Sequence, residues 1–174
     1  MTDTTLLHPG DPFPGLIVNL PGGRTVHLPS DLAGRFGVVL FYRGAWCPHC
    51  NAQLAAFQRT LDGLAEVDAS VVALSVDDEA TTRDLIARHG LRFPVGHSAD
   101  AAAVADATGA FVNPGPPLLQ STGFVLDPDG RVMGSVYSSG AIGRLVPQDV
   151  IRLIGYLRGS QLSSQEAPHG TATA

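Results

Sequence analysis

Cysteine is scarce in this chain of 174 residues, which contains only Cys47 and Cys50. Two cysteines cannot build a structural disulfide framework, and their spacing closes too small a loop to act as a useful staple. The chain also lacks an apolar run of membrane-spanning length, and its first ten residues show neither the basic nor the apolar segment of a signal peptide. We therefore expect a cytoplasmic protein with no membrane contact, in which the cysteine pair is catalytic.

Positive charge is scarce as well. Eleven basic residues stand against 16 acidic ones, which gives a formal net charge of −5, and no polybasic stripe is present. This balance argues against a nucleic-acid partner. A hydrophobic content of 44% over this length indicates one compact domain. We expect a flexible N-terminus over residues 1–12, a folded domain over 13–158 and a disordered tail over 159–174.

The cysteines lie where a buried strand gives way to a helix. Residues 38–42 are an apolar run, Gly44 interrupts it, and helical periodicity begins after Cys50. Cys47 occupies the N-cap position and Pro48 the first helical position, where proline is favoured. Cys50 follows three residues later on the same helix face, so the two sulfurs can meet. Because a helix N-terminus stabilises a thiolate, we expect a lowered Cys47 pKa.

Strand and helix patterns alternate along the rest of the chain. The sequence predicts strands at 16–20, 25–28, 37–43, 70–76, 93–95, 124–126 and 131–133, and helices from Cys50 through Leu64 and at 79–89, 99–107 and 147–158. The Asp-Pro-Asp-Gly turn at 127–130 favours a hairpin, and residues 109–123 have the composition of a loop. The order indicates an α/β fold with parallel crossovers and a central mixed sheet flanked by helices.

These features resemble the thioredoxin fold and, within it, the redoxin branch of alkyl hydroperoxide reductases and thiol-specific antioxidants that includes the peroxiredoxins. Residues 42–50, Tyr-Arg-Gly-Ala-Trp-Cys-Pro-His-Cys, resemble the active-site loop of a peroxiredoxin-like bacterial subgroup. Residues 124–127 with Gly130 look like the late hairpin of the family, and Gly143-Arg144 matches a Gly-Arg pair before its last helix. The resemblance implies a thiol-dependent antioxidant oxidoreductase without a bound cofactor.

The active-site identities depart from the family pattern. The resemblance assigns the peroxidatic position to Cys50, but the usual Thr position is Cys47, the Pro position is Arg43 and the Arg position is Ser121. The resemblance therefore leaves Arg43 or Arg144 to supply the positive charge that holds and polarises a peroxide.

Compared with thioredoxins, Cys47 is the nucleophile and Cys50 the resolving thiol. The buried Asp of thioredoxins is replaced by Phe41, and the position of their cis-Pro is Ser121. The dipeptide Pro48-His49 equals that of the strongly oxidising DsbA-type proteins, which suggests redox tuning. A protonated His49 would favour the thiolate, and a solvated helix residue is the equal alternative.

Two reaction schemes follow from the resemblance. With a hydroperoxide, Cys50 attacks, becomes a sulfenic acid and condenses with Cys47. With a disulfide substrate, Cys47 attacks and Cys50 releases the mixed disulfide. In the thioredoxin-like interpretation, Trp46 would shield the disulfide and help to dock substrates, and a partly buried core residue is the alternative. Both schemes need an external reductant, namely thioredoxin, glutaredoxin or a small thiol, because the sequence holds no flavin or nicotinamide motif. Proteins of this group often dimerise, so a homodimer is an open alternative.

Three other interpretations stay open at this point. A thioredoxin-type disulfide oxidoreductase would lack peroxidase activity, and a non-enzymatic redox sensor would switch without turning over a substrate. A zinc-binding domain needs three or four protein ligands, whereas the chain offers one cysteine pair. We therefore expect no metal and place redox chemistry first.

Overall fold

The computed structural model describes residues 6–165, and for residues 161–165 it describes the backbone alone. The strands are β1 (Leu16–Leu20), β2 (Arg24–Leu28), β3 (Phe36–Phe41), β4 (Ala69–Leu74), β5 (Val95–Gly96), β6 (Val112–Pro114), β7 (Pro117–Leu119), β8 (Thr122–Leu126) and β9 (Val132–Tyr137). The helices are α1 (Pro48–Arg59), α2 (Leu61–Glu66), α3 (Glu79–His89), α4 (Ala101–Thr108) and α5 (Pro147–Gln165), with a short 3-10 turn at Ser30–Leu32.

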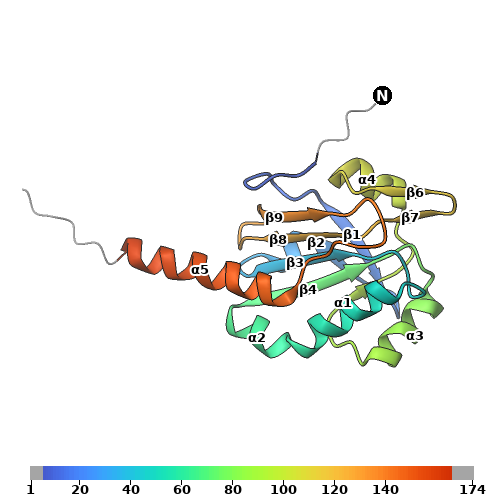
Figure 1. Ribbon diagram of the computed structural model, residues 1–174, viewed down its shortest axis with the longest axis horizontal. Coiled ribbons are helices and arrows are strands. Elements are labelled where there is room, and N and C mark those ends of the chain that lie inside the picture. Colours follow the sequence, from blue (N-terminus) through green and yellow to red (C-terminus); the bar gives the residue numbers. More distant parts are fainter. Residues whose placement is uncertain (1–5, 166–174) are drawn as a thin grey trace, which may run out of the picture.

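A five-stranded sheet forms the centre of the molecule, in the order β5-β4-β3-β8-β9 (Figure 1). Strands β3, β4 and β5 are parallel, whereas β8 runs antiparallel to β3 and β9 antiparallel to β8. Every residue of β3 is buried, as the apolar run in the sequence predicts for a central strand covered on both faces. The predicted α/β fold with a mixed sheet is confirmed.

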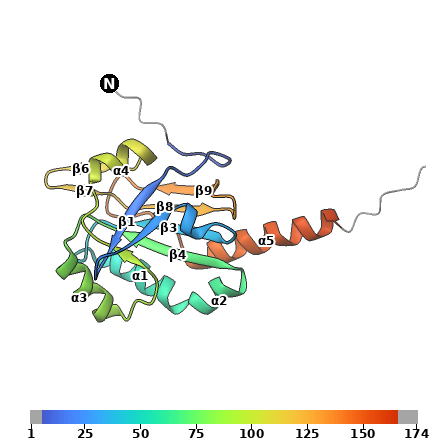
Figure 2. The ribbon, with the colours of Figure 1, turned by 180° about the vertical axis from the view of Figure 1, so that it is seen from behind.

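The two faces of the sheet are covered differently. On one face, Val38 and Leu40 of β3 belong to a core cluster with Phe57 of α1, and residues of α2, α3 and α5 complete it. On the other face, Val39 and Phe41 pack in a cluster with the β1–β2 hairpin and α4. Figures 1 and 2 show these two layers from opposite sides. The alternation along β3 follows from the two-residue period of a strand.

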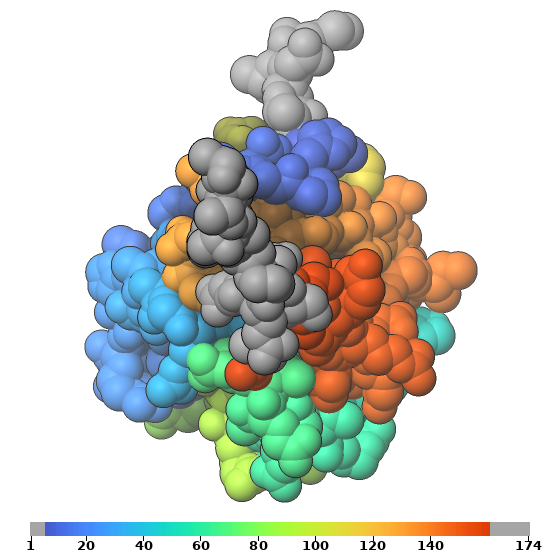
Figure 3. All heavy atoms as spheres, turned by 90° about the vertical axis from the view of Figure 1, so that its left-hand side faces the viewer, coloured from blue at the N-terminus to red at the C-terminus, as the bar shows by residue number. Residues whose placement is uncertain are grey.

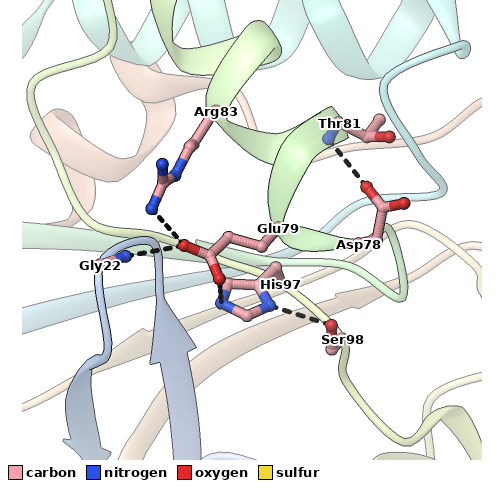
Figure 4. A network of polar contacts seen from close by, with 7 residues as sticks. All are labelled: Gly22, Asp78, Glu79, Thr81, Arg83, His97 and Ser98. Carbon is pink, nitrogen blue, oxygen red and sulfur yellow. Dashed lines mark hydrogen bonds and ion pairs between the residues drawn. The ribbon is translucent and has the colours of Figure 1, made fainter.

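A polar network fastens the β1–β2 turn to the start of α3 (Figure 4). The Glu79 carboxylate accepts a hydrogen bond from the Gly22 N–H at 2.9 Å and pairs with Arg83 one helical turn later. His97 Nε2 lies 3.9 Å from the same carboxylate, and His97 Nδ1 lies 2.9 Å from Ser98 Oγ. The network therefore fixes the segment that follows β5.

Two predictions about the elements are wrong. The helix predicted from Cys50 through Leu64 is divided, because the Thr60 N–H bonds to the Phe57 carbonyl and its hydroxyl to the Ala56 carbonyl at 2.9 Å, which ends α1. Residues 109–123, predicted as a loop, contain β6, β7 and the start of β8. These strands are short and rich in proline, so they carry no clear two-residue period.

Both ends of the predicted domain differ from the structure where it describes them. Gly10 donates to the Val132 carbonyl at 2.8 Å, and the Val132 N–H donates to the Asp11 carbonyl at 2.9 Å, so this part of the predicted flexible N-terminus lies along β9. Helix α5 continues through Gln165, past its predicted end at residue 158. Figure 3 shows α5 beside α2, and Arg158 bonds to the Glu66 carbonyl there. Residues 1–5 and 166–174 of the predicted termini lie outside the described residues.

Candidate active site

The two thiols lie at the N-terminus of α1, at the C-terminal end of β3. Cys47 is the N-cap, with φ −84° and ψ 112°, and Pro48 begins the helix as predicted. The Cys47 carbonyl accepts the first helical hydrogen bond, from the Asn51 N–H at 3.0 Å. Both cysteines are free thiols, and their exposed fractions are 1% for Cys47 and 0% for Cys50. The pair is therefore covered by protein rather than open to solvent.

The turn before the thiols depends on a glycine. Gly44 has φ +153°, and a Cβ built on it would lie 2.4 Å from Trp46 Nε1. The Trp46 indole is thus folded over the bare Gly44 backbone, which no larger residue would permit. The Gly44 carbonyl then accepts from the Cys47 N–H at 3.1 Å, which closes the turn and delivers Cys47 to the N-cap.

Arg144 reaches both sulfurs from the loop between β9 and α5. Its Nη2 lies 3.1 Å from Cys50 Sγ and 3.6 Å from Cys47 Sγ. Its Nη1 donates to the Ala141 carbonyl at 2.7 Å, which aims the guanidinium. The loop is tied to α1 by Gln53, whose Nε2 donates to the Leu145 carbonyl at 3.1 Å. Arg144 follows Cys50 by 94 positions and Cys47 by 97 in the sequence, and the fold brings its guanidinium to both sulfurs.

Arg43 approaches the thiols through its backbone. Its N–H lies 3.4 Å from Cys50 Sγ. Its guanidinium carbon lies 4.9 Å from the centre of the Trp46 ring, a cation–π contact. Trp46 itself is 58% exposed, so it flanks the thiols on the surface rather than sealing them off.

The surroundings push the pKa values of the two thiols apart. Burial raises the pKa of Cys47, but donation from the Cys50 side chain and backbone, the Arg144 charge and Arg43 outweigh it, so the Cys47 pKa lies below its ordinary value. The pKa of Cys50 is raised, chiefly by burial and by its hydrogen bond to Cys47, despite Arg144 and the Arg43 N–H. These directions favour one negative charge on the pair over two, and favour it on Cys47 over Cys50.

Two of the predicted site residues, His49 and Ser121, are not among the hydrogen-bond donors to the sulfurs. His49 is exposed on α1. Ser121 is buried, and its carbonyl accepts from the Ser138 N–H at 3.0 Å at the end of the β8–β9 pair. Arg43 and Arg144 do donate to the sulfurs, in addition to the contacts between the two cysteines.

Sequence reasoning missed two residues that shape the loop. Asp77 Oδ2 accepts from the Ala45 N–H at 2.7 Å, and Asn51 Nδ2 donates to the Ala45 carbonyl at 2.9 Å. A signal for Asp77 was present: it follows β4, the parallel neighbour of β3, and the C-terminal ends of parallel strands meet at one edge of the sheet.

A cavity of about 370 Å³ lies on the other face of the sheet, between β1 and α4. Its walls include Val18, His97 and Val104, and neither cysteine lines it. This cavity is therefore separate from the thiol site. Within residues 6–165, no group of three His, Cys, Asp or Glu side chains is placed to hold a metal ion. No helix in that range is long and apolar enough to cross a bilayer.

Comparison with known sequences gives one family. The model of the AhpC/TSA family matches residues 9–135. A peroxiredoxin of Methanothermobacter marburgensis is 29% identical over 167 residues, covering 91% of this chain and 76% of the relative. An alkyl hydroperoxide reductase C of Mycobacterium tuberculosis is 26% identical over 152 residues, covering 82% and 73% of the two chains.

Solved structures agree in fold. The peroxidoxin BcpB of Mycobacterium tuberculosis superposes with a TM-score of 0.74 at 21% identity, over 87% of this chain and 99% of that one. AhpC of the same organism gives 0.73 at 22% identity, over 91% and 97%. With a mixed sheet of this topology and two thiols at the first helix, the chain belongs to the AhpC/TSA family and is a thiol-dependent oxidoreductase of the peroxiredoxin type with a thioredoxin-like fold.

Proposed function

We propose that this protein reduces hydroperoxides through a dithiol–disulfide cycle of Cys47 and Cys50. The observation that carries the proposal is the Arg144 guanidinium, 3.1 Å and 3.6 Å from the two sulfurs at a helix N-terminus. A thiolate is the nucleophile toward peroxide, and a cation beside it both stabilises the thiolate and favours charge developing on the peroxide oxygen. Names of relatives such as alkyl hydroperoxide reductase C support the same substrate class.

We assign the first attack to Cys47. The family pattern implies Cys50, but the electrostatics support the opposite order, because the Cys47 pKa is lowered and the Cys50 pKa is raised. Cys47 is also the helix N-cap, where the helix dipole and a hydrogen bond from the Cys50 backbone favour a thiolate. The substitution of the usual Thr by Cys47 thus exchanges a positioning hydroxyl for a reacting sulfur.

The cycle balances in three steps. The Cys47 thiolate attacks one oxygen of the hydroperoxide and breaks the O–O bond, and the leaving alkoxide or hydroxide takes up a proton. The Cys50 thiol then displaces water from the Cys47 sulfenic acid and forms the Cys47–Cys50 disulfide. Two external thiols reduce this disulfide back to the Cys47 and Cys50 thiols and are themselves oxidised to a disulfide.

The electrons of the third step come from an external thiol system, which we propose to be thioredoxin, glutaredoxin or a small thiol. Because the disulfide must be reduced in every turnover, we place the cycle in the reducing cytoplasm. The exposed Trp46 at the edge of the site provides an apolar contact for a reductant. That this protein forms a homodimer stays a prediction.

Stopped-flow fluorescence tests the assignment, because Trp46 is the single tryptophan and adjoins Cys47. Reduced wild type, Cys47→Ser and Cys50→Ser are mixed with hydrogen peroxide and with an organic hydroperoxide. We expect a peroxide-dependent change in wild type and in Cys50→Ser, and none in Cys47→Ser. Mass spectrometry should find the disulfide in oxidised wild type and a trapped sulfenic acid in Cys50→Ser.

The outcomes separate the two parts of the proposal. A response that Cys47→Ser keeps and Cys50→Ser loses would return the attacking role to Cys50 while leaving the peroxidase function intact. Slow oxidation of wild type by both peroxides, together with rapid reaction toward disulfides, would overturn the peroxidase function itself.

A further inference from the structure

We propose that Asp77 is a positioning residue for the reaction, holding the turn that delivers Cys47 to the N-cap of α1. Asp77 follows β4 and its Oδ2 accepts the Ala45 N–H at 2.7 Å. Its Oδ1 is directed at the same turn, 3.1 Å from where a Cβ on Gly44 would lie. A single carboxylate therefore touches the two residues at the start of the turn and none of the reacting atoms.

The Ala45 peptide groups are held from both sides. Asp77 binds the N–H, and Asn51, one turn into α1, donates to the carbonyl at 2.9 Å. Cys47 comes two residues later, and its own N–H is bonded to the Gly44 carbonyl at 3.1 Å. With both ends of this segment fixed, the φ and ψ of Cys47 are fixed too. The helix amides can stabilise its sulfur only while that geometry holds.

Asp77 is itself rigidly held. Its carbonyl accepts from the Ser98 N–H at 2.7 Å and its N–H donates to Ser75 Oγ at 3.2 Å. Ser98 belongs to the polar network of Figure 4, which anchors the segment after β5. Within the described residues Asp77 forms no ion pair, so no cationic side chain competes with the Ala45 N–H for its carboxylate. The carboxylate's hydrogen bond to the Ala45 N–H, at 2.7 Å, is as short as the backbone bond to Ser98.

Positioning and plain charge make opposite predictions for Asp77. A carboxylate near a thiolate disfavours the thiolate, so removing its charge alone would lower the pKa of Cys47. If Asp77 positions the turn, its loss releases Cys47 from the N-cap and raises that pKa. The charged groups facing Cys47 are Arg144 and Arg43, and they are the same in every variant compared. The thiol partner Cys50 is replaced by Ser in all of these variants alike.

The test measures the Cys47 pKa in a Cys50→Ser background, where Cys47 is the only thiol, from thiolate absorbance and from the pH dependence of iodoacetamide alkylation. For Asp77→Ala we expect a pKa about 1 unit higher and hence about tenfold less thiolate below the pKa. For Asp77→Asn the amide oxygen still accepts from Ala45, so we expect most of the shift to be rescued. Asp78→Asn is the matched control, because it removes a neighbouring charge and keeps the α3 cap to Thr81.

The proposal rests on the proposed function, in which Cys47 carries the thiolate. The experiments distinguish a failure of that function from a failure of the Asp77 role. The assigned attack fails if the response to peroxide is kept in Cys47→Ser and lost in Cys50→Ser, and this result leaves the Asp77 comparison interpretable because all its variants share the Cys50→Ser background. A lowered parent pKa that falls further, or stays unchanged, in Asp77→Ala overturns the positioning role alone. If Asp77→Ala fails to fold, by circular dichroism, Asn51→Ala and Asp77→Asn decide. Positioning requires a raised Cys47 pKa in Asn51→Ala, which loses the bond to the Ala45 carbonyl, and no comparable rise in Asp77→Asn, which keeps the bond to the Ala45 N–H.

Discussion

Arg144 contacts both sulfurs, yet its two distances differ by only half an ångström, so it serves the pair rather than one cysteine. Which sulfur holds the charge is then decided by what else surrounds each one. Cys47 receives the Cys50 side-chain and backbone donors, whereas Cys50 lies deeper and loses more solvation. In the order of attack that we propose, the negative charge therefore lies on Cys47, three residues before the position that the family pattern implies.

Replacing Arg144 with Met should raise the Cys47 pKa, since a cation beside a thiolate favours the charged form. We expect a rise of about 1 unit, as is typical for one close opposite charge. The pH dependence of alkylation in the Cys50→Ser background measures it. Arg152→Met is the control, because Arg152 is an exposed cation on α5 that pairs at the surface with Asp149. Equal shifts in the two variants would mean that net charge, and not the contact, sets the pKa.

The loop that carries Arg144 is placed by its fit to β8. A Cβ on Gly123 would lie 2.5 Å from Leu145 Cδ1 and 3.2 Å from Leu145 Cβ. Leu145 adjoins Arg144, and its carbonyl is bonded to Gln53 of α1. The absence of a side chain at Gly123 thus lets the loop lie on the sheet at the height of the thiols.

Gly123→Ala should therefore push Leu145 outward and withdraw Arg144 from the sulfurs. We expect a loss of roughly 1–3 kcal/mol in the free energy of unfolding, typical of overpacking, together with slower oxidation by peroxide. Gly134→Ala is the matched control in neighbouring β9, where the nearest atom to an added Cβ is Leu153 Cδ2 at 3.9 Å. Urea unfolding and stopped-flow fluorescence measure the two effects. Unchanged peroxide kinetics in Gly123→Ala would show that the loop tolerates the displacement.

Sequence patterns predicted the elements whose signals are local. Helix α3 ends at Gly90 in the left-handed conformation, and its bounds agree with the prediction, because cap and stop signals lie within the helix itself. The division at Thr60 was missed because it depends on a backbone turn within an unbroken apolar stripe. Strands β6 and β7 were missed because their pairing is with each other across a proline-rich turn.

The site shows the same limit. Cys47 and Cys50 are read from a local motif, and Arg144 entered only through a family match. Its approach to the sulfurs, from a loop more than 90 positions away, depends on Leu145 fitting over Gly123 and on Gln53. Asp77 depends on β4 lying beside β3, which a strand pattern indicates without showing the register. Contacts between distant segments carry no period that a single sequence could reveal.

The whole molecule offers an unusually clear alkaline titration, because all eleven of its basic residues are arginine. Arginine stays charged to pH values above 12, so the groups titrating between about pH 10 and 12 are mainly the tyrosines. Tyr42, at the end of β3 beside the thiol loop, is fully buried, and its hydroxyl has no hydrogen-bond partner of normal geometry among the described residues. Burial, above all, raises its pKa to about 12.

A raised pKa means that Tyr42 favours the folded state fully below pH 10 and ceases to do so as the pH rises toward its folded pKa. In that window the unfolded chain loses the phenol proton and the folded protein keeps it. Wild type should therefore lose roughly 2 kcal/mol of unfolding free energy between pH 10 and 12 through this residue.

Tyr42→Phe removes the ionisable group and keeps the ring, so its unfolding free energy should fall less over the same window by about that amount. Urea unfolding under reducing conditions at pH 8, 10, 11 and 12 measures the difference, while phenolate absorbance follows the titration. Both proteins keep Tyr137 and both thiols, so the contributions of these groups cancel in the comparison. Parallel curves for the two proteins would show that the Tyr42 phenol ionises without unfolding, and hence that the core below the thiols admits water and charge.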